Sequence, residues 1–340
     1  LDVPLADSYD ARVLHPPGTT VSEVRPSSPI SQVGIEHLHI QCPALETAYG
    51  NAPYSAIRMD CQDSWVRDVY CQETMNSIVP RGRRITLERV RVTHTYANLG
   101  ASKPSDFSLE GSQILVDRCE ITGDNMYFVW TGSLIAGPNV LFNCTFRGRG
   151  SRIQPHQRWA TGLLIANCTV PDGGIDLPNR GAAGSGHGWT MGWGVVWNSV
   201  ASFFVIQNHP GAPNWAIGCV GDRLRTARYF DTSPVLPEGI FDSHGTPVTP
   251  QSLYLAQLAD RLGPEALMNS GYASNTAAMF PNKSVARLPP WKDADPALGM
   301  NLGLRRPVNT IGRPESREHA GEEACDGNDN TYWATQGNRP

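Results

Sequence analysis

The segment Val140–Phe146 (VLFNCTF) decides the fold, because similar segments recur along the chain at regular distances. The next copy is Leu163–Val170, in which Cys168 takes the place of Cys144. An earlier copy is Ile114–Ile121, and its Cys119 precedes Cys144 by almost the same distance at which Cys168 follows it. The remaining copies are Gly194–Val200 and Trp215–Val220, with weaker ones at Ile35–Ile40, Trp65–Cys71 and Ile85–Val92. Each copy reads as two short apolar strands with a bend between them.

One such unit is too small to bury its own apolar face, so successive units must stack. The repeat therefore predicts an all-β fold, a right-handed parallel β-helix over residues 1–221 that is incomplete at its N-terminus. Asn143, Asn167 and Asn198 stand just before the small residue, where asparagine tolerates a left-handed bend. Their amides could also pair from coil to coil. An antiparallel β-sandwich is the alternative, but its strands recur every 8–12 residues, about half the spacing found here.

Composition narrows the class of function. The formal net charge is -4 and no basic block is visible, so no nucleic-acid partner is expected. No apolar run reaches the roughly 18 residues of a membrane span. Lysine is rare, so arginine must make most contacts with anions. Several of the eight cysteines occupy equivalent positions of the repeat, and we expect small buried core residues there, not disulfides or metal ligands.

The chain changes character after the repeat fades. Residues 222–267 include four leucines between 253 and 262 at helical spacing, followed by Gly263. This pattern predicts a C-terminal helical segment that packs on the solenoid. Residues 268–314 are rich in Pro, Asn and Gly and read as a linker or wrap. Residues 315–340 form a separate piece.

The register of the repeat brings two histidines together. His156 precedes Cys168 by the same distance at which His187 precedes Ser199, the residue in the cysteine position of its own copy. Without an intervening insertion, the two imidazoles occupy one position on neighbouring coils, about 4.8 Å apart. Histidine exchanges protons near neutral pH, so both are candidate catalytic residues.

A further outward position lies two residues on, because side chains along a strand alternate faces. It holds Arg158 and Trp189, and the same offsets on the next coil give Gln207 and His209. Arg158 is a candidate catalytic residue, since a guanidinium can hold a carboxylate in a fork. The predicted substrate-binding residues are Trp189, Trp159, Arg180, Gln207 and His209. A solvated polar sheet face is the alternative for any one of these residues alone.

No metal or other cofactor is expected. The two histidines have no carboxylate at a matching offset to complete a zinc site. A calcium requirement is the alternative, and its candidate ligands are Asp106, Glu110, Asp117 and Asp124. These carboxylates are scattered along the chain.

The pieces Asn143–Phe146, Asn167–Val170 and Asp63–Val69 resemble the pectate-lyase-like superfamily of parallel β-helices, over roughly residues 33–221. The superfamily includes polysaccharide lyases, polygalacturonase-type hydrolases and adhesins. The resemblance implies the fold named above and a polysaccharide as partner. It also implies that the substrate lies along an outer strand face just upstream of the asparagine bend.

The segment Gly186–Gly188 (GHG) resembles an element of polygalacturonases. Those hydrolases carry paired aspartates on the two preceding coils, where this chain has Gly132–Leu134 and His156–Arg158. A general acid and a general base for inverting hydrolysis are therefore missing from the expected place. Asp172 or Asp176 could substitute for them.

The tail segment Ala324–Thr335 resembles the opening of a discoidin-type (factor five/eight C-type) carbohydrate-binding domain. The resemblance implies that residues 315–340 are the truncated start of such a module. We therefore expect a secreted, monomeric part of a longer modular chain, with a glycan as its partner.

The preferred hypothesis is a secreted polysaccharide lyase that cleaves a uronic-acid-containing glycan by β-elimination. His156 or His187 would remove the proton next to the carboxylate, Arg158 would stabilise the developing negative charge, and Trp189 would stack on a sugar ring. A glycoside hydrolase on the same face is the alternative. A non-catalytic glycan-binding or adhesin β-helix is the second alternative.

Overall fold

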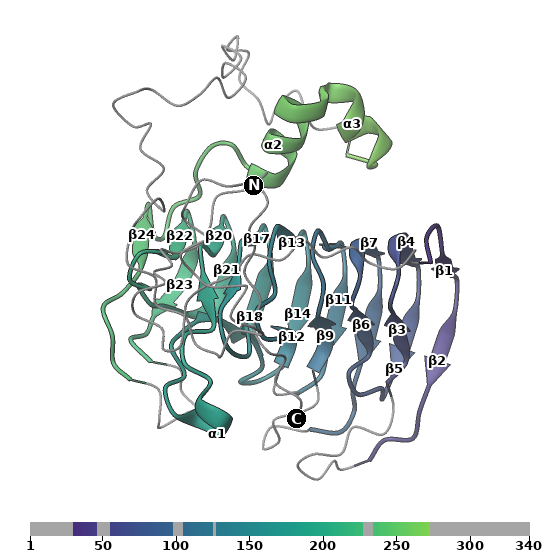
Figure 1. Cartoon of the computed structure of the whole chain (residues 1–340), viewed down its shortest axis with the longest axis horizontal. Helices are drawn as coiled ribbons and strands as arrows, with labels where there is room; N and C mark the ends of the chain where they lie inside the picture. Colours follow the sequence, from purple (N-terminus) through teal and green to yellow (C-terminus); the bar gives the residue numbers. More distant parts are fainter. Residues whose placement is uncertain (1–29, 46–54, 98–104, 125–126, 227–233, 273–340) are drawn as a thin grey trace, which may run out of the picture. The chain divides into compact units, whose positions relative to one another are not determined.

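The computed structural model describes residues 30–45, 55–97, 105–124, 127–226 and 234–272, all within one compact unit that spans residues 29–281. Short parallel strands follow one another in successive coils (Figure 1). The predicted linker beyond residue 272 and the predicted carbohydrate-binding piece lie outside the described residues. None of the helices in the described segments has the length and apolar character needed to span a bilayer.

Nine strands form the first sheet, one from each successive coil. In spatial order they are β1 (Gly34–Glu36), β4 (Gln62–Arg67), β7 (Arg83–Glu88), β10 (Leu115–Asp117), β13 (Asn139–Phe142), β17 (Leu163–Ala166), β20 (Val195–Trp197), β22 (Trp215–Ile217) and β24 (Ile240–Asp242). Every pairing between them is parallel. The strands therefore repeat once per coil, as the sequence copies predicted.

The larger sheet supplies the other two sides of each coil. One run consists of β2 (His39–Gln41), β5 (Tyr70–Gln72), β8 (Arg91–Thr93), β11 (Glu120–Thr122) and β14 (Thr145–Arg147). The other consists of β3 (Ile57–Met59), β6 (Ile78–Pro80), β9 (Ser105–Leu109), β12 (Tyr127–Thr131) and β15 (Arg152–Ile153). The long strand β18 (Thr169–Leu177) pairs with both runs, and β21 (Val200–Ile206) and β23 (Val220–Arg223) continue from it. A small third sheet pairs β16 (Ala160–Thr161) with β19 (Met191–Gly192).

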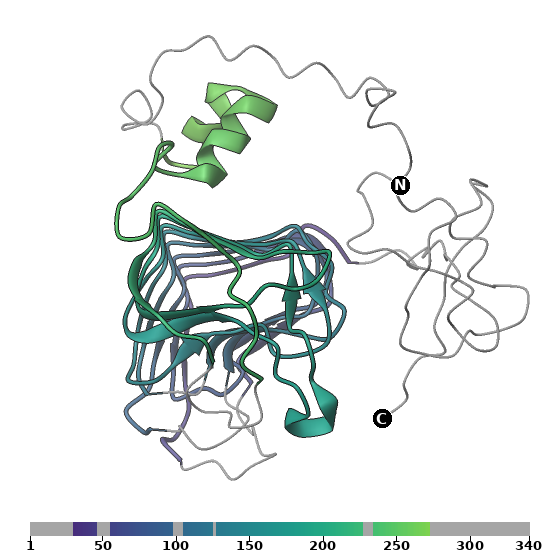
Figure 2. The ribbon, with the colours of Figure 1, turned by 90° about the vertical axis from the view of Figure 1, so that its left-hand side faces the viewer.

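The result is an all-β parallel solenoid, seen along its stack in Figure 2. Its register follows the sequence repeat, since Leu141 pairs with Val116 on one side and with Ile165 on the other. The coils extend further than the expected boundary at residue 221. Strand β24 pairs with β22, so the solenoid runs to Asp242.

The small residues of the repeat lie in the core. Cys119, Cys144, Cys168 and Cys219 are at most 1% exposed, and Ser199 replaces cysteine on one coil and is fully buried. All seven cysteines in the described segments are free thiols. Burial of such small side chains lets the two strands of a coil meet closely while water stays excluded. The predicted role of these cysteines as core residues is confirmed.

The asparagines occupy left-handed bends, with φ of 54° at Asn143, 55° at Asn167 and 43° at Asn198. Their amides do not pair from coil to coil as the sequence allowed. The amide of Asn198 donates to Val248 O (2.8 Å), and that of Asn167 donates to Gln251 O (2.9 Å). The bends therefore hold the segment that leads into the C-terminal helices.

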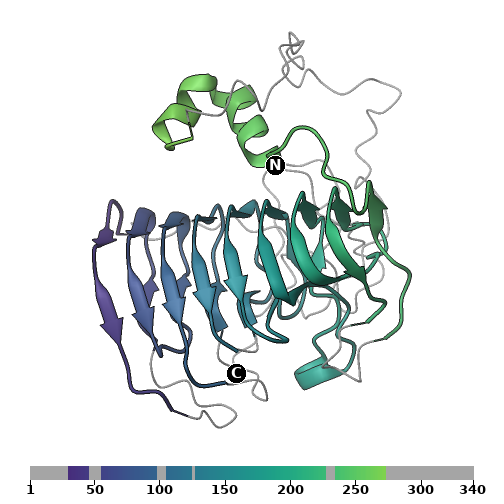
Figure 3. The same cartoon turned by 180° about the vertical axis from the view of Figure 1, so that it is seen from behind.

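Those helices are α2 (Leu253–Leu262) and α3 (Pro264–Asn269), and both are visible beside the nine-stranded sheet in Figure 3. The Ser252 hydroxyl accepts the backbone N–H of Leu255 and caps α2, which ends at Gly263 as predicted. An apolar layer joins helices and sheet. Its buried members are Leu255, Leu258 and Leu267 from the helical part and Phe142 and Ala166 from the sheet.

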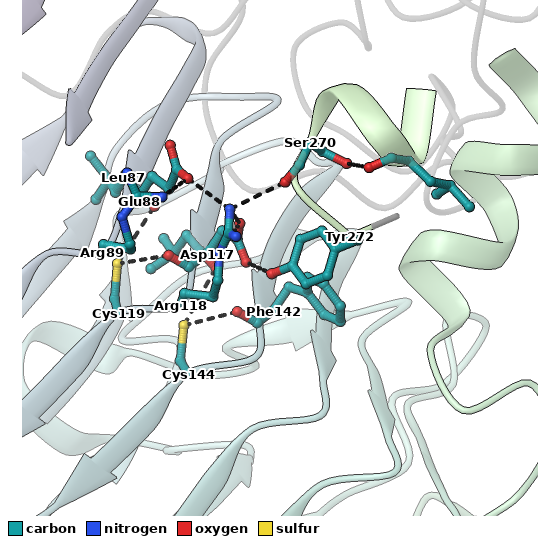
Figure 4. Close-up of polar contacts among 12 residues, drawn as sticks. Leu87, Glu88, Arg89, Asp117, Arg118, Cys119, Phe142, Cys144, Ser270 and Tyr272 are labelled. Atoms are coloured by element: carbon teal, nitrogen blue, oxygen red, sulfur yellow. Dashed lines mark hydrogen bonds and ion pairs between the residues drawn. The ribbon is translucent and has the colours of Figure 1, made fainter. Parts of the chain in front are cut away.

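A polar clasp fixes the end of α3 to the solenoid (Figure 4). The Tyr272 hydroxyl donates to the Asp117 carboxylate, and the Arg118 guanidinium lies 4.6 Å above the Tyr272 ring. Arg118 also donates to Asp117 (3.0 Å), Glu88 (2.7 Å) and the Ser270 carbonyl (3.3 Å). Burial raises the pKa of Asp117 to about 6, against the opposing effects of Tyr272 and Arg118.

Candidate functional site

Two histidines face each other on neighbouring coils. The Nε2 atoms of His156 and His187 are 3.1 Å apart, and the ring centroids are 4.8 Å apart. The backbone explains the approach, because Arg158 N donates to His187 O (3.0 Å) and Ala160 pairs with Met191. The juxtaposition that the repeat register predicted is therefore present.

Arg180 determines where the protons of this pair lie. Its Nη1 contacts His156 Nδ1 (3.0 Å) and donates to the His156 carbonyl (2.7 Å). Because arginine is always a donor, Nδ1 of His156 must accept, so a neutral His156 carries its proton on Nε2. That proton points at Nε2 of His187, whose own proton is therefore on Nδ1. The chain of hydrogen bonds runs from Arg180 through His156 to His187.

The surroundings of His187 disfavour a charge on its ring. Burial is the main cause that lowers the pKa of His187, and the positive charge of Arg180 adds to it. A hydrogen bond from the imidazole to the Ala183 backbone opposes the shift, and Arg158 contributes a smaller lowering. An additional proton on the pair would break either the contact between the rings or the contact with Arg180, since both nitrogens of His156 are already engaged.

A glycine-rich loop holds His187 in place. It leaves the sheet at Asn179, which forms an antiparallel bridge with Trp189, and contains the single turn α1 (Ala183–Gly186). Gly184 adopts φ of 59°, and a Cβ there would lie 2.0 Å from Cε1 of His187. The imidazole therefore packs on the bare backbone of this residue, a position that a larger side chain would obstruct.

Aromatic rings form the wall beside His156. The Trp130 ring centroid is 4.3 Å from that of His156, and Tyr127 meets the same imidazole edge-on at 5.5 Å. Tyr127 is fully buried, which raises its pKa, while the nearby charges of Arg180 and Arg152 oppose the rise. Its hydroxyl nevertheless makes no hydrogen bond of normal geometry with the described residues.

A buried ion pair lies on the same outer face. Arg152 Nη1 donates to Asp176 Oδ2 (2.6 Å), and Gln154 Nε2 donates to the same oxygen (3.0 Å). The side chains of Arg152 and Asp176 are both 0% exposed. Burial raises the pKa of Asp176, and the charge of Arg152 opposes that rise.

Buried polar atoms with unused hydrogen-bonding capacity gather around this face. Among the described residues they include Tyr127 Oη, Trp130 Nε1, Gln154 Oε1, Asp176 Oδ1 and His187 Nδ1. Native proteins satisfy almost every buried polar atom with protein, ordered water or ligand. Ordered water molecules can supply the missing partners of such atoms.

A second aromatic group follows the histidines on the same coils. The His209 ring contacts two indoles, with its centroid 3.9 Å from that of Trp159 and 4.7 Å from that of Trp189. Trp159 lies over Gly192, where a Cβ would come within 3.0 Å of the indole. Three of the predicted substrate-binding residues are therefore neighbours.

Two predicted site residues lie differently from the expected face. Arg158 adopts φ of 46°, which breaks the alternation of a strand, and its guanidinium binds the carbonyl (2.7 Å) and hydroxyl (2.6 Å) of Ser185. Gln207 is 1% exposed, and its Oε1 accepts the backbone N–H of Asn179 (2.6 Å). Its backbone N–H donates to Leu177 O, so Gln207 is aligned with the residues before the inserted loop 179–188. The ungapped count ignored this loop and aligned Gln207 with His187. Gln207 therefore braces that loop and does not join the histidines.

Carboxylates do not assemble into a metal site in the segments that the structure describes, where no three His, Cys, Asp or Glu side chains come together. The four candidate calcium ligands each contact a different basic residue. The pairs are Asp106 with His94, Glu110 with Arg81, Asp117 with Arg118 and Asp124 with Arg149.

Several members of this face were not predicted from the sequence, above all Tyr127, Trp130 and Arg152. A signal existed, since Gln154 N donates to Val129 O and so places Gln154 beside Trp130 on adjacent coils. Extending the register count upstream of the histidines would have found these residues.

Comparisons with protein-family models, curated proteins and solved structures find no match to this chain.

Proposed function

We propose that the chain is a right-handed parallel β-helix of the pectate-lyase-like type and cleaves a uronic-acid-containing polysaccharide by β-elimination. One observation carries the proposal, the contact between His156 and His187 next to the guanidinium of Arg180. β-Elimination needs a base for the proton next to a carboxylate and a cation for the negative charge that develops. These two requirements meet here within hydrogen-bonding distance.

The cation in this proposal is Arg180, not the Arg158 of the sequence-based hypothesis. Arg180 contacts His156 directly, whereas the Arg158 guanidinium is engaged by Ser185. Arg158 still contributes to the electrostatic field at His187, because its charge lowers the pKa of that imidazole. We assign it a supporting role at the loop that carries His187.

The aromatic residues supply a binding surface for sugar rings. Indoles present flat apolar faces, and a pyranose ring can stack on them through its C–H groups. Trp159 and Trp189 follow His156 and His187 on the same two coils, and both rings contact His209. A glycan bound across these coils would contact the catalytic and the aromatic residues together.

Glycoside hydrolysis has less support on this face. Asp176 is fully buried in its ion pair with Arg152, and Asp172 is exposed four residues earlier in β18. Asp172 lies within the register shift between Val170 and Gly174, before the regular part of the strand that carries Asp176. A polymeric glycan substrate also favours an extracellular place of action, so the proposal includes secretion.

The test is incubation with a panel of soluble polyuronates: polygalacturonate, alginate, hyaluronan and heparan sulfate. β-Elimination creates a conjugated double bond, so the ultraviolet absorbance of the product rises. New reducing ends without that absorbance would mean hydrolysis. Binding without any product would mean a non-catalytic glycan-binding protein. Either result overturns the lyase proposal.

A further inference from the structure

We infer that Arg180 keeps the proton-accepting nitrogen of His156 occupied until a ligand carboxylate binds the guanidinium, so that carboxylate binding exposes the base. The inference rests on the proposed function and adds a positioning role for Arg180. It starts from the tautomers above, in which Nδ1 of His156 accepts from Arg180 at 3.0 Å and Nε2 donates to His187. In that arrangement neither nitrogen of His156 is available to take a proton from a substrate.

A carboxylate changes the preferred partner of Arg180. A guanidinium binds a carboxylate through two parallel, charge-assisted hydrogen bonds, which are stronger than one hydrogen bond to a neutral imidazole. Arg180 can turn toward the carboxylate while its backbone stays fixed by the bond from Arg180 N to Gly188 O (2.7 Å). The lone pair on Nδ1 of His156 is then free.

The same movement brings the reacting hydrogen to that nitrogen. In a uronate the acidic C–H is on the carbon that carries the carboxylate. A carboxylate on Arg180, whose Nη1 lies 3.0 Å from Nδ1, therefore places the C–H near the freed lone pair. The bound carboxylate also offsets the charge of Arg180, which favours a proton on the neighbouring imidazole.

In the elimination step the C–H bond breaks, its proton forms a new N–H bond at Nδ1 of His156, and its electron pair becomes the C=C bond. The C–O bond to the leaving sugar breaks, and that oxygen takes a proton from the hydroxyl of Tyr127, whose ring meets His156 edge-on. The imidazolium then returns its proton to the tyrosinate, so the protein ends as it began. No metal or redox partner is consumed.

The first test is ¹⁵N NMR of the histidine side chains in the full chain without ligand. The expected spectrum shows His156 protonated on Nε2 and His187 protonated on Nδ1. In Arg180→Gln both histidines should show mixed tautomers, while Arg147→Gln, a change at an exposed arginine, should leave the spectrum of the wild type. A proton on Nδ1 of His156 in the wild type would overturn the inference, whether or not the protein cleaves a glycan.

The second test adds trimers of galacturonate, guluronate or glucuronate. At least one should change the Nδ1 signal of His156 in the wild type and none should do so in Arg180→Gln. No change with any trimer would overturn the coupling. Arg180→Lys, which keeps the charge without the fork, covers the case in which Arg180→Gln fails to fold. With an active substrate, Arg180→Lys should lower kcat more than it raises KM, whereas a purely structural role would show as a loss of thermal stability.

Discussion

His156 and His187 lie with their Nε2 atoms 3.1 Å apart although 31 positions separate them in the chain. The spacing between them equals the length of one coil, so the solenoid itself creates the pair. Each partner is oriented by a different element. Arg180 holds His156 through its other nitrogen, and the glycine-rich loop holds His187. The pair is therefore a property of two coils and an inserted loop together.

Replacement of His156, the proposed base, should remove most of the activity. General acid–base catalysis contributes about 10²- to 10⁴-fold, so kcat of His156→Ala should fall by that factor with little change in KM. His37 is 71% exposed, and His37→Ala serves as the control. Steady-state kinetics on the polyuronate that the wild type cleaves would check this. Equal activity of His156→Ala and His37→Ala would exclude His156 from catalysis.

A side chain at Gly184, the glycine beneath His187, should lower activity where one at a neighbouring glycine does not. A Cβ at Gly184 would collide with the imidazole, so Gly184→Ala should displace His187 and lower kcat at least tenfold. Gly186 also has a left-handed φ, but its Cβ would meet no atom within 4 Å. Gly186→Ala should thus share the backbone strain of about 1 kcal/mol and keep its activity. If the two variants lose activity equally, the loop acts through its backbone and not through contact with His187.

The indoles should affect binding more than turnover. Trp159→Ala and Trp189→Ala remove stacking contacts worth about 1 kcal/mol each, so the Kd for a uronate oligomer should rise roughly fivefold. Trp65→Phe is the control, because Trp65 lies in β4 on one of the first coils of the solenoid. Calorimetric titration gives the comparison. An unchanged Kd in both alanine variants would remove the indoles from the binding surface.

The clasp between α3 and the solenoid should make stability depend on pH. The pKa of Asp117 is about 6 in the folded protein against an ordinary 3.8, so the folded state binds this proton more tightly. Its contribution is therefore complete below about pH 4 and is lost as the pH rises through 6. The shift corresponds to at most about 3 kcal/mol. Asp117→Asn cannot ionise and lacks this dependence.

Urea unfolding at pH 5 and pH 7.5 would show the difference. Between those values the wild type should lose free energy of unfolding relative to Asp117→Asn, while Asp172→Asn, at an exposed carboxylate, should follow the wild type. Parallel pH profiles of the wild type and Asp117→Asn would contradict the assignment. The comparison of variants is needed because His94 acts in the same direction: burial lowers its pKa, but the charge of Asp106 and the hydrogen bond to it leave that pKa raised.

Much of the fold was predictable because the repeat encodes it. Stacked coils need one small core residue and one left-handed bend per turn, and the segments around Cys144 and Cys168 show both in the sequence. The helix from Leu253 to Leu262 was predictable from its leucine spacing and Gly263. The end of the solenoid was not, because Ile240–Asp242 pairs with β22 although its sequence lacks the repeat pattern.

The site was predictable from the sequence only between coils that align without an insertion. The count holds between His156 and His187, since backbone pairing continues from Ala160 to Met191. It fails at Gln207. The inserted loop separates Leu177 from His187 on one coil, and Gln207 on the next coil pairs with Leu177, before the loop, and not with His187, which lies within it. The role of Arg180 also depends on where that loop folds, which no repeat pattern specifies.

The central claim is that this face cleaves a uronate polymer by β-elimination through the histidine pair. The most direct measurement is the ultraviolet absorbance of polygalacturonate, alginate, hyaluronan and heparan sulfate during incubation with the wild type and with His156→Ala. We expect one of these substrates to give a steady rise with the wild type and almost none with His156→Ala. No rise with any of them, or an equal rise with both proteins, would contradict the account.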